Sequence, residues 1–346
     1  MVIEISDIVI GCGFGDEGKG KVVYDLLKDG NYQLCVRFNG SGNAGHTIYR
    51  NTDKQKLVVH QLPVGILVPG VFNLISSDCL IDIERLKMEI NELKEKNVDI
   101  DGRILISKAC HIITQDSIDY DRNNNKIGTT SSGIGPTYSQ KMLRIGKRAE
   151  DYEEEFHNLN IHLVDMRKFW YSKFVIDCIK TVLLEGAQGF ELDINWTNNY
   201  PYCTSSTCTI GGAINTGISL TSIRNIYGIA KSYDTYVGTM SFQPEEYDNE
   251  LNLIANKGFE YGSTTGRKRQ CNFLNLDNLI EALALNSCNQ CIINKTDILM
   301  DANIFKLYYD NNLISFENID LMCNYIRDTL ESLVDKVIFS FNPYTI

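Results

Sequence analysis

The amino-acid sequence predicts an α/β fold in which helices flank a central, mainly parallel sheet around a P-loop-like nucleotide-binding core. Three observations predict it. Short β-branched apolar runs alternate with stretches of helical period, a glycine-rich loop follows the first apolar run, and no repeat or low-complexity linker divides the 346 residues. The hydrophobic content of 43% is sufficient for a substantial core in a chain of this length. We therefore expect residues 1–346 to form a single domain.

The individual elements are placed by the period of their apolar residues and by the turn residues between them. We expect strands at 2–10, 34–38, 72–75, 104–107, 181–184, 226–229 and 291–293. We expect helices at 19–27, 83–94 and 322–334, and a charged surface helix in the acidic stretch 150–167. Strands that alternate with helices in this way favour βαβ units and a parallel sheet.

The overall charge and the cysteines restrict the class of protein. The formal net charge is −11 and no basic stripe with interleaved aromatic residues is present, so we expect no nucleic-acid partner. The apolar runs are too short to cross a bilayer, so we expect no membrane partner. Eleven scattered cysteines and no secretory leader favour a soluble protein of the reducing cytoplasm, or of the host cytoplasm if a virus encodes the chain. Cys288 and Cys291 form a C-x-x-C without the second pair that a zinc site needs, so we assign no metal to them.

Residues 13–21 read G-F-G-D-E-G-K-G-K and contain the order G-x-x-x-x-G-K of a phosphate-binding loop. In such a loop the glycines let backbone N–H groups surround the phosphates, and Lys19 neutralises their charge. Gly20 stands where a serine or threonine usually holds Mg²⁺, so another oxygen ligand is needed, and Asp16 is the nearest carboxylate. The same glycines fit the dinucleotide pattern G-x-G-x-x-G, and a turn without a ligand is a further alternative, but the lysine and two acidic residues favour a metal–triphosphate.

Four further loops carry polar groups suited to nucleotide chemistry. The loop N-G-S-G-N-A-G-H-T at 39–47 places His46 among glycines, which suits it for general acid catalysis. The loop I-G-T-T-S-S-G-I-G-P at 127–136 offers hydroxyl and backbone donors to a monophosphate. The loop G-S-T-T-G-R-K-R at 262–269 adds two arginines, the usual clamp for a carboxylate or phosphate. N-K-T-D at 294–297 has the residue order that recognises a guanine base. For each of these four loops, the alternative is an ordinary structural turn without a ligand.

Taken in order, seven motifs resemble adenylosuccinate synthetase, from the first strand to about residue 299. They are G-D-E-G-K-G-K at 15–21, N-A-G-H-T at 43–47, I-G-T-T with G-I-G-P at 127–136, E-G-A-Q-G at 185–189, Y-P-Y with T-S-S at 200–206, T-T-G-R at 264–267 and K-T-D at 295–297. That family joins L-aspartate to C6 of a 6-oxopurine nucleotide. A nucleoside triphosphate phosphorylates O6, and the aspartate amine then displaces the phosphate. The resemblance implies a C–N ligase of purine biosynthesis.

The resemblance also implies a role for each matched residue. Asp16 would remove the N1 proton and bind Mg²⁺, His46 would be the acid that assists transfer of the γ-phosphate, and the carbonyl of Gly45 would be a second metal ligand. The residues implied for the purine nucleotide are Asn43, Thr130, Arg144, Gln188 and Thr204. Those implied for L-aspartate are Thr264, Thr265 and Arg267. Those implied for the triphosphate are Gly15, Glu17, Gly18, Lys19, Gly20, Lys21, Arg269, Lys295 and Asp297. Arg144 would reach the 5′-phosphate in a neighbouring subunit, which implies a homodimer.

Several departures from the common family pattern leave the substrates open. Ser132 stands where the common enzyme has arginine, 237–242 replaces a glycine–proline segment, and the base-binding turn near the C-terminus is reduced to 340–343. Compact members include archaeal enzymes and a virus-encoded branch that uses dGMP to form 2-aminoadenylosuccinate, and residues 200–209 resemble that branch. Because the branch often carries serine where Asp16 stands, we expect IMP as acceptor, and Asp297 favours GTP as donor. The alternative is dGMP with ATP, dATP or GTP.

Two other classes of protein share part of the pattern. A GTP-binding switch protein shares the phosphate loop and N-K-x-D, but it has no use for His46 or for the loop around Arg267. A nicotinamide dehydrogenase shares only the glycine spacing. GTP binding without aspartate-dependent turnover would indicate the first, and NADH binding the second.

Overall fold

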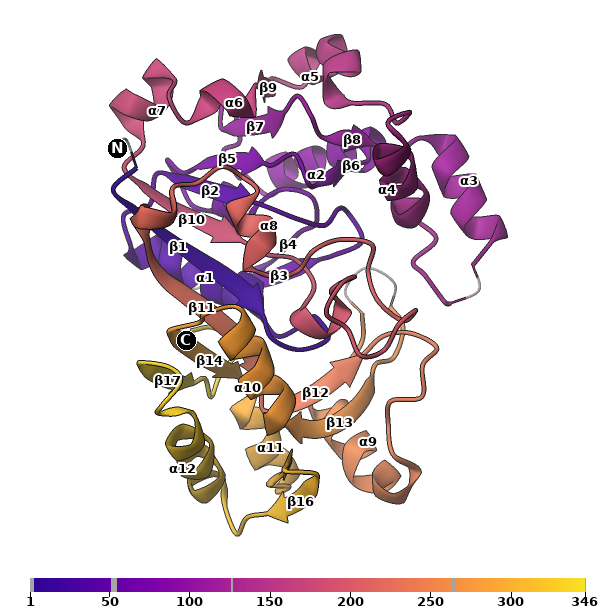
Figure 1. The fold of residues 1–346 in the computed structure, drawn as a ribbon, viewed down its shortest axis with the longest axis vertical. Coiled ribbons are helices and arrows are strands. Elements are labelled where there is room, and N and C mark those ends of the chain that lie inside the picture. The colour runs from indigo at the N-terminus through magenta and orange to yellow at the C-terminus, as the bar shows by residue number, and fades with distance from the viewer. Residues whose placement is uncertain (1–2, 51–54, 126, 263–265, 346) are drawn as a thin grey trace.

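The computed structural model describes residues 3–50, 55–125, 127–262 and 266–345 (Figure 1). Its main sheet has nine strands in the order β17-β14-β11-β1-β10-β2-β5-β7-β9, and every pair of neighbours is parallel. The strands are β1 Ile5–Gly11, β2 Leu34–Arg37, β5 Phe72–Ile75, β7 Ile104–Ser107, β9 His162–Val164, β10 Thr181–Glu185, β11 Ile223–Lys231, β14 Gln290–Asn294 and β17 Lys336–Phe339. The predicted α/β fold around a mainly parallel sheet is confirmed.

Both faces of the sheet are buried, because successive side chains of a strand point to opposite faces. In β1, Ile8 and Ile10 belong to one apolar cluster and Val9 belongs to the other. The first cluster includes side chains of α10 (Leu276–Leu285) and α12 (Ile319–Leu330), and the second includes those of α1 (Lys19–Asp29) and α2 (Ile83–Glu95). Burial on both faces explains why the strands read as continuous apolar runs in the sequence.

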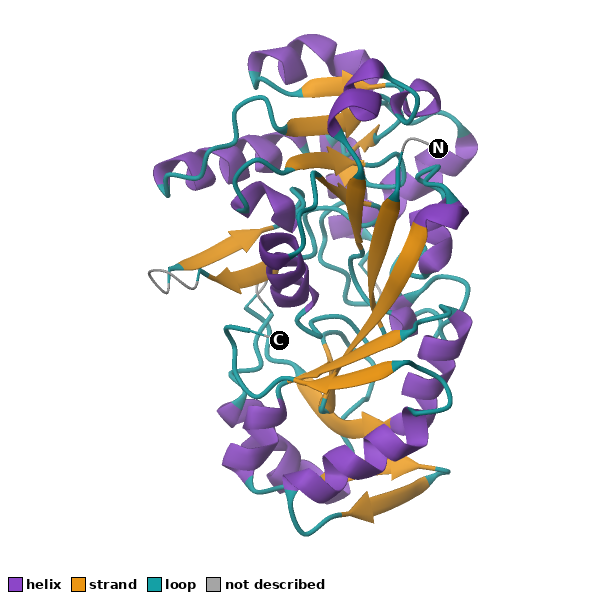
Figure 2. Ribbon diagram, turned by 90° about the vertical axis from the view of Figure 1, so that its left-hand side faces the viewer, coloured by secondary structure: helices purple, strands orange, loops and turns teal. Residues whose placement is uncertain are grey.

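The remaining elements surround this sheet. The other helices are α3 Gln115–Asn123, α4 Ile134–Leu143, α5 Glu153–Asn158, α6 Met166–Phe169, α7 Lys173–Cys178, α8 Ile210–Ile214, α9 Asp248–Lys257 and α11 Thr296–Ala302. A second sheet contains β12 Tyr233–Tyr236, β13 Gln270–Asn275, β15 Lys306–Tyr309 and β16 Asn312–Ser315, and a short one pairs β6 Leu80–Ile81 with β8 His111–Ile112. β3 His46–Tyr49 and β4 Lys56–Val59 form an antiparallel hairpin that extends to one side of the main sheet (Figure 2). Among the described helices, none is long and apolar enough to cross a membrane.

The prediction of one charged helix at 150–167 is wrong. A 3-10 turn at Ala149–Tyr152 leads into α5, which ends at Asn158, and Asn160 adopts a left-handed conformation with φ of 57°. The chain then forms β9, in which His162 pairs with Leu105 of β7. The apolar residues between the charges therefore extend the main sheet by an edge strand instead of forming a helix face. The other predicted strands and helices are present, with ends that differ by up to four residues.

The strand order brings the predicted functional loops together. In a parallel sheet the carboxyl ends of all strands lie at one edge, where ligands of such folds bind. At this edge β14 leads into the N-K-T-D segment, and β11 leads into β12. Their neighbour β1 leads into the phosphate loop, β10 into the 186–193 turn, and β2 into the 38–45 loop. Segments that are far apart in the sequence therefore share one edge.

Candidate active site

The phosphate loop is built around a buried ion pair. The Glu17 carboxylate accepts hydrogen bonds from the backbone N–H groups of Gly13 (3.1 Å) and Gly15 (2.8 Å). Its other oxygen lies 2.5 Å from Nζ of Lys19, and both side chains are buried. Gly18 ends the loop with φ of 87°, a conformation that favours glycine, and α1 follows directly. Glu17 thus holds the loop in shape from within, and the backbone of 15–20 remains the part that can face a phosphate.

Gly20 leaves room for His46. A Cβ at position 20 would lie only 2.7 Å from the Cβ of His46, so the serine or threonine of an ordinary phosphate loop does not fit here. His46 begins β3 and packs against the first turn of α1. Position 20 is therefore glycine, and not the usual serine or threonine, because His46 occupies the space beside the phosphate loop.

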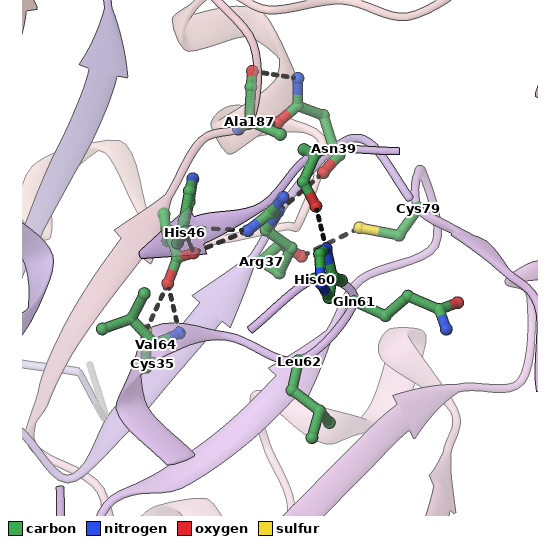
Figure 3. Close-up of polar contacts among 12 residues, drawn as sticks. Cys35, Arg37, Asn39, His46, His60, Gln61, Leu62, Val64, Cys79 and Ala187 are labelled. Carbon is green, nitrogen blue, oxygen red and sulfur yellow. Dashed lines mark hydrogen bonds and ion pairs between the residues drawn. The ribbon is translucent and has the colours of Figure 1, made fainter. Parts of the chain in front are cut away.

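His46 is held by a buried carboxylate (Figure 3). Its Nδ1 lies 2.6 Å from Oε1 of Glu185, at the end of β10, and Nη1 of Arg37 donates to the same oxygen at 2.7 Å. The second oxygen of Glu185 accepts from the N–H of Val64 at 2.7 Å. Because a carboxylate only accepts, we assign the proton at this nitrogen to His46, so its 3.3 Å approach to Arg37 is not a hydrogen bond. This leaves Nε2 as the end of the ring available to a ligand.

The charges of this cluster oppose one another. Burial alone would raise the pKa of Glu185, but His46, Arg37 and the N–H of Val64 outweigh it and lower the pKa to about 2. Burial lowers the pKa of His46, and the Glu185 carboxylate opposes that effect. An arriving polyphosphate adds negative charge beside the ring and would favour the imidazolium. The cluster can therefore present a proton to a phosphate and take it back.

Two amides have buried atoms without a protein partner. Among the described residues, Oδ1 of Asn43 and both polar atoms of the Gln188 side chain make no hydrogen bond. The backbone beside Gln188 is fixed because Asn39 bonds both the N–H and the C=O of Ala187, at 2.7 and 3.1 Å. A Cβ on Gly40 would lie 3.3 Å from Oε1 of Gln188, so the amide lies over that glycine. Buried polar groups without partners are the groups that a ligand can satisfy.

The 127–131 loop meets Arg267. Its guanidinium donates to the carbonyls of Gly128 (3.0 Å) and Thr129 (3.3 Å), and Thr239 donates to the carbonyl of Ile127 at 3.1 Å. The predicted monophosphate loop and the arginine of the predicted aspartate clamp are therefore neighbours, as is the divergent segment 237–242. Thr130 is half-buried in the same loop. Thr264 and Thr265 lie outside the described residues.

Asp16 lies at the exposed tip of the phosphate loop, with φ of 59°. Nη2 of Arg269 is 2.9 Å from its carboxylate, and the same guanidinium bonds Glu260, which is buried. Burial would raise the pKa of Glu260, but Lys231, Arg269 and Lys295 lower it to about 2. A buried carboxylate thus positions the arginine that contacts Asp16.

The N-K-T-D segment supports the phosphate loop from the other side. Asn294 donates to the carbonyl of Glu17 at 2.8 Å, and Lys295 donates to the carbonyl of Gly258 at 3.0 Å. Lys21 of α1 donates to Oγ of Ser340 at 2.6 Å, so the reduced C-terminal turn lies beside α1. Burial lowers the pKa of Lys21 to about 8. Asp297 is half-buried. Its carboxylate acts on the charge of Lys21, which also bonds Ser340, so Asp297 lies near this turn.

Arg144 is the one predicted purine residue that the structure places apart. It follows α4 with φ of 64° and is exposed, without a side-chain contact to the other predicted site residues within the described ranges. Met142, Leu143 and Ile145 beside it are 72%, 66% and 70% exposed. Thr204 is nearer, since its N–H bonds the carbonyl of Leu192, four residues after Gln188.

Comparisons with known proteins identify this arrangement. A family model described as adenylosuccinate synthetase matches residues 8–179 and 152–313. The adenylosuccinate synthetase of Meyerozyma guilliermondii is 35% identical over 343 residues, covering 85% of this chain and 79% of that protein. The enzyme of Wigglesworthia glossinidia brevipalpis is 36% identical over 347 residues, covering 87% of this chain and 79% of that protein. The chain belongs to the adenylosuccinate synthetase family.

Solved structures agree with this assignment. The fully ligated adenylosuccinate synthetase of Plasmodium falciparum is similar with a TM-score of 0.81 and 25% identity, over 99% of this chain and 98% of that one. The succinoaminodeoxyadenylate synthetase of cyanophage S-2L, solved with dGMP and dATP, has a TM-score of 0.77 and 20% identity, over 99% of this chain and 94% of that one. At this identity the likeness is one of fold. As an adenylosuccinate synthetase family member the protein is a nucleotide-dependent C–N ligase, as predicted. The switch-protein and dehydrogenase alternatives are thereby set aside.

Four residues of the adenylosuccinate synthetase site had no predicted role. Glu185 holds His46, and Arg37 pairs with Glu185. Glu260 holds Arg269, and Lys231 pairs with Glu260. A charged residue inside an otherwise apolar strand is a usable signal for Arg37, and Glu185 begins a recognised motif. Glu260 and Lys231 carry no such local signal, because their importance depends on which strands become neighbours.

Proposed function

We propose that this adenylosuccinate synthetase family member joins L-aspartate to IMP with hydrolysis of GTP, releasing adenylosuccinate, GDP and phosphate. The observation that carries the proposal is that Asp16, His46 and the unpartnered amide of Gln188 lie on loops from neighbouring strands at one edge of the sheet. A base, an acid and a purine-binding amide are the groups that the two-step reaction requires.

In the first step, Asp16 would take the N1 proton of the purine, which makes O6 nucleophilic toward the γ-phosphorus. His46 would direct Nε2–H to the phosphoryl oxygens and neutralise charge that develops there. Lys19 and the backbone of the loop would bind the triphosphate, and Arg269 would leave Asp16 for the phosphates when they arrive. In the second step the amine of L-aspartate attacks C6 and phosphate leaves, with Arg267 holding a carboxylate of the amino acid.

The donor set of the phosphate loop fits Mg²⁺. Asp16 offers a carboxylate at an exposed tip, and the carbonyl of Gly45 accepts no backbone or side-chain hydrogen bond within the described residues. Within those ranges no group of three or more His, Cys, Asp or Glu side chains could hold a metal, which suits an ion that is held mostly by phosphate oxygens. We propose that Asp16 and Gly45 bind Mg²⁺ together with the triphosphate. The ion would supply charge neutralisation for phosphoryl transfer.

The remaining assignments follow the same pattern. Asn43, Thr130 and Thr204 would join Gln188 around the purine nucleotide, and Thr264 and Thr265 would join Arg267 around L-aspartate. Lys295 and Asp297 would read the guanine of GTP, with Lys21 supporting the turn at 340–345 that closes this pocket. The remaining loop residues, Gly15, Glu17, Gly18 and Gly20, would shape the triphosphate site.

We also propose a homodimer in which Arg144 completes the partner's purine site. Arg144 is exposed, carries no side-chain contact to the rest of the described site, and is flanked by exposed apolar side chains. A patch of this kind is typical of a protein–protein contact.

The competing substrate pair is dGMP with ATP or dATP. The likeness of fold to the cyanophage enzyme, whose structure contains dGMP and dATP, keeps it as the second candidate. Aspartate-dependent phosphate release with each acceptor and donor distinguishes the two. A site that hydrogen-bonds a 2-amino group would discriminate against IMP by orders of magnitude in kcat/KM.

A further inference from the structure

A small cavity lies beneath the phosphate loop, on the side of β12 and α10. Its volume is about 10 Å³, which is room for one water molecule or one ion. The polar groups that line it are Glu191, Asp234, Asn275 and Asn278, and the loop contributes Gly13 and Phe14. None of the four polar residues belongs to the proposed reaction site.

Glu191 is the unusual member of this group. It is only 4% exposed, and its carboxylate has no hydrogen-bond partner within the described residues. Its position is fixed by the backbone, because its N–H donates to the carbonyl of Gly13 at 3.1 Å. A carboxylate without a partner in a buried site is costly, so something must compensate its charge.

Asp234 supplies a second carboxylate to the same cavity. One of its oxygens accepts from the N–H of Asn275 at 3.1 Å, and the other lies 3.6 Å from the place that a Cβ on Gly13 would take. The nearby cation, Lys231, is already paired with Glu260 at 3.6 Å. The other charged groups that face the pair are Glu17 of the loop and Glu281 of α10, both negative.

We propose that Glu191 and Asp234 form a binding site for one hard divalent cation, with the side-chain oxygen of Asn278 as a third donor. Two carboxylates balance a divalent charge, and oxygen donors suit Ca²⁺ or Mn²⁺. Mg²⁺ fits less well, since it retains several waters and the cavity has room for one small species.

The site would tie together the two halves of the catalytic edge. Glu191 comes three residues after Gln188, Asp234 lies on β12, and both face Gly13 of the phosphate loop. An ion between them would fix the spacing of the purine-binding turn from the triphosphate loop. Its role is therefore structural support, separate from the Mg²⁺ that accompanies the triphosphate.

A proton is the competitor for this cation. Burial, with Asp234 and Glu281, raises the pKa of Glu191 to about 7, and burial, with Glu17, raises the pKa of Asp234 to about 7. Because a carboxylate must be deprotonated to bind the ion, the affinity should rise with pH.

The test is calorimetric titration of Ca²⁺ and of Mn²⁺ into the full chain without nucleotide, in an Asp16→Asn background that removes the carboxylate of the Mg²⁺ site. We expect one ion per chain, with tighter binding as the pH rises. Adding Glu191→Gln and Asp234→Asn should weaken binding by at least about tenfold. Asp328→Asn is the matched control, since this exposed carboxylate lies on α12 and is not among the residues that line the cavity, so its loss should leave binding intact.

Thermal unfolding gives a second readout. Ca²⁺ should raise the midpoint of the Asp16→Asn protein and leave that of the variant with both added amides unchanged. If that variant fails to fold, Asn278→Ala should weaken Ca²⁺ binding on its own. Absence of saturable binding of either ion at pH 8, or undiminished binding after both carboxylates are removed, would overturn the proposal. These measurements involve no turnover, so their failure would not affect the proposed function.

Discussion

Nδ1 of His46 lies 2.6 Å from a carboxylate oxygen of Glu185, and this contact fixes which end of the imidazole can face a phosphate. Because the carboxylate accepts a hydrogen bond from Nδ1–H, Nε2 is the atom left for catalysis. Arg37 and the N–H of Val64 keep Glu185 ionised, and both partners come from different segments of the chain. Glu185 is therefore a positioning residue for His46.

Glu185→Gln should lower kcat by about 10²-fold or more, because it removes the charge that keeps His46 protonated and oriented. Since the carboxylate opposes the lowering of the His46 pKa by burial, its loss should lower that pKa further. The protonated fraction then disappears at lower pH, so the alkaline limb of the kcat–pH profile should move to lower pH. The control is His46→Asn, in which the added Glu185→Gln should cost little more. An unmoved alkaline limb would exclude this positioning role.

Asp16→Asn should abolish turnover while the purine nucleotide still binds, because the amide cannot take the N1 proton. The check is phosphate release together with IMP binding by calorimetry. Asp29→Asn, at the exposed end of the same helix α1, is the control and should be fully active. Normal turnover by Asp16→Asn would remove Asp16 from the role of base.

Gly20→Ser should destabilise the protein by about 1–3 kcal/mol and lower activity, although it restores the usual phosphate-loop sequence. The reason is the 2.7 Å approach of a new Cβ to His46. Chemical denaturation measures the effect. Gly135→Ala in α4 is the matched control, since its Cβ would meet only Oγ of Ser205 at 3.5 Å, and it should be neutral or slightly stabilising. Equal stability of Gly20→Ser and wild type would contradict the packing argument.

Arg144→Leu should raise KM for the purine nucleotide, because the 5′-phosphate loses its cation. Mixed oligomers of Arg144→Leu with Asp16→Asn provide the sharper measurement. If Arg144 acts across subunits, some mixed dimers contain one intact site, and at low IMP concentration the activity of the mixture should exceed the sum of the activities of the two separate preparations. A mixture that stays inactive, or a protein that sediments as a monomer with full activity, would count against the shared site.

The sequence predicted the parallel sheet and most of its strands, because strands buried on both faces leave continuous apolar runs such as that of β1. It failed at 150–167, where the charges suggested a helix and the edge strand β9 depends on pairing with a strand more than fifty residues earlier. The ligand-facing loops were predictable because glycines and paired polar residues follow each strand. Their supports were not assigned roles. Arg37 and Glu185 carry a local signal, but they and Glu260 act through neighbours that only the strand order brings together.

The most direct test of the account is aspartate-dependent phosphate release with Mg²⁺, with IMP, GMP and dGMP each combined with GTP, ATP and dATP. We expect turnover with IMP and GTP, and none when L-aspartate is omitted. Turnover with dGMP and not with IMP would contradict the proposed acceptor, and no aspartate-dependent release with any pair would contradict the proposed reaction itself.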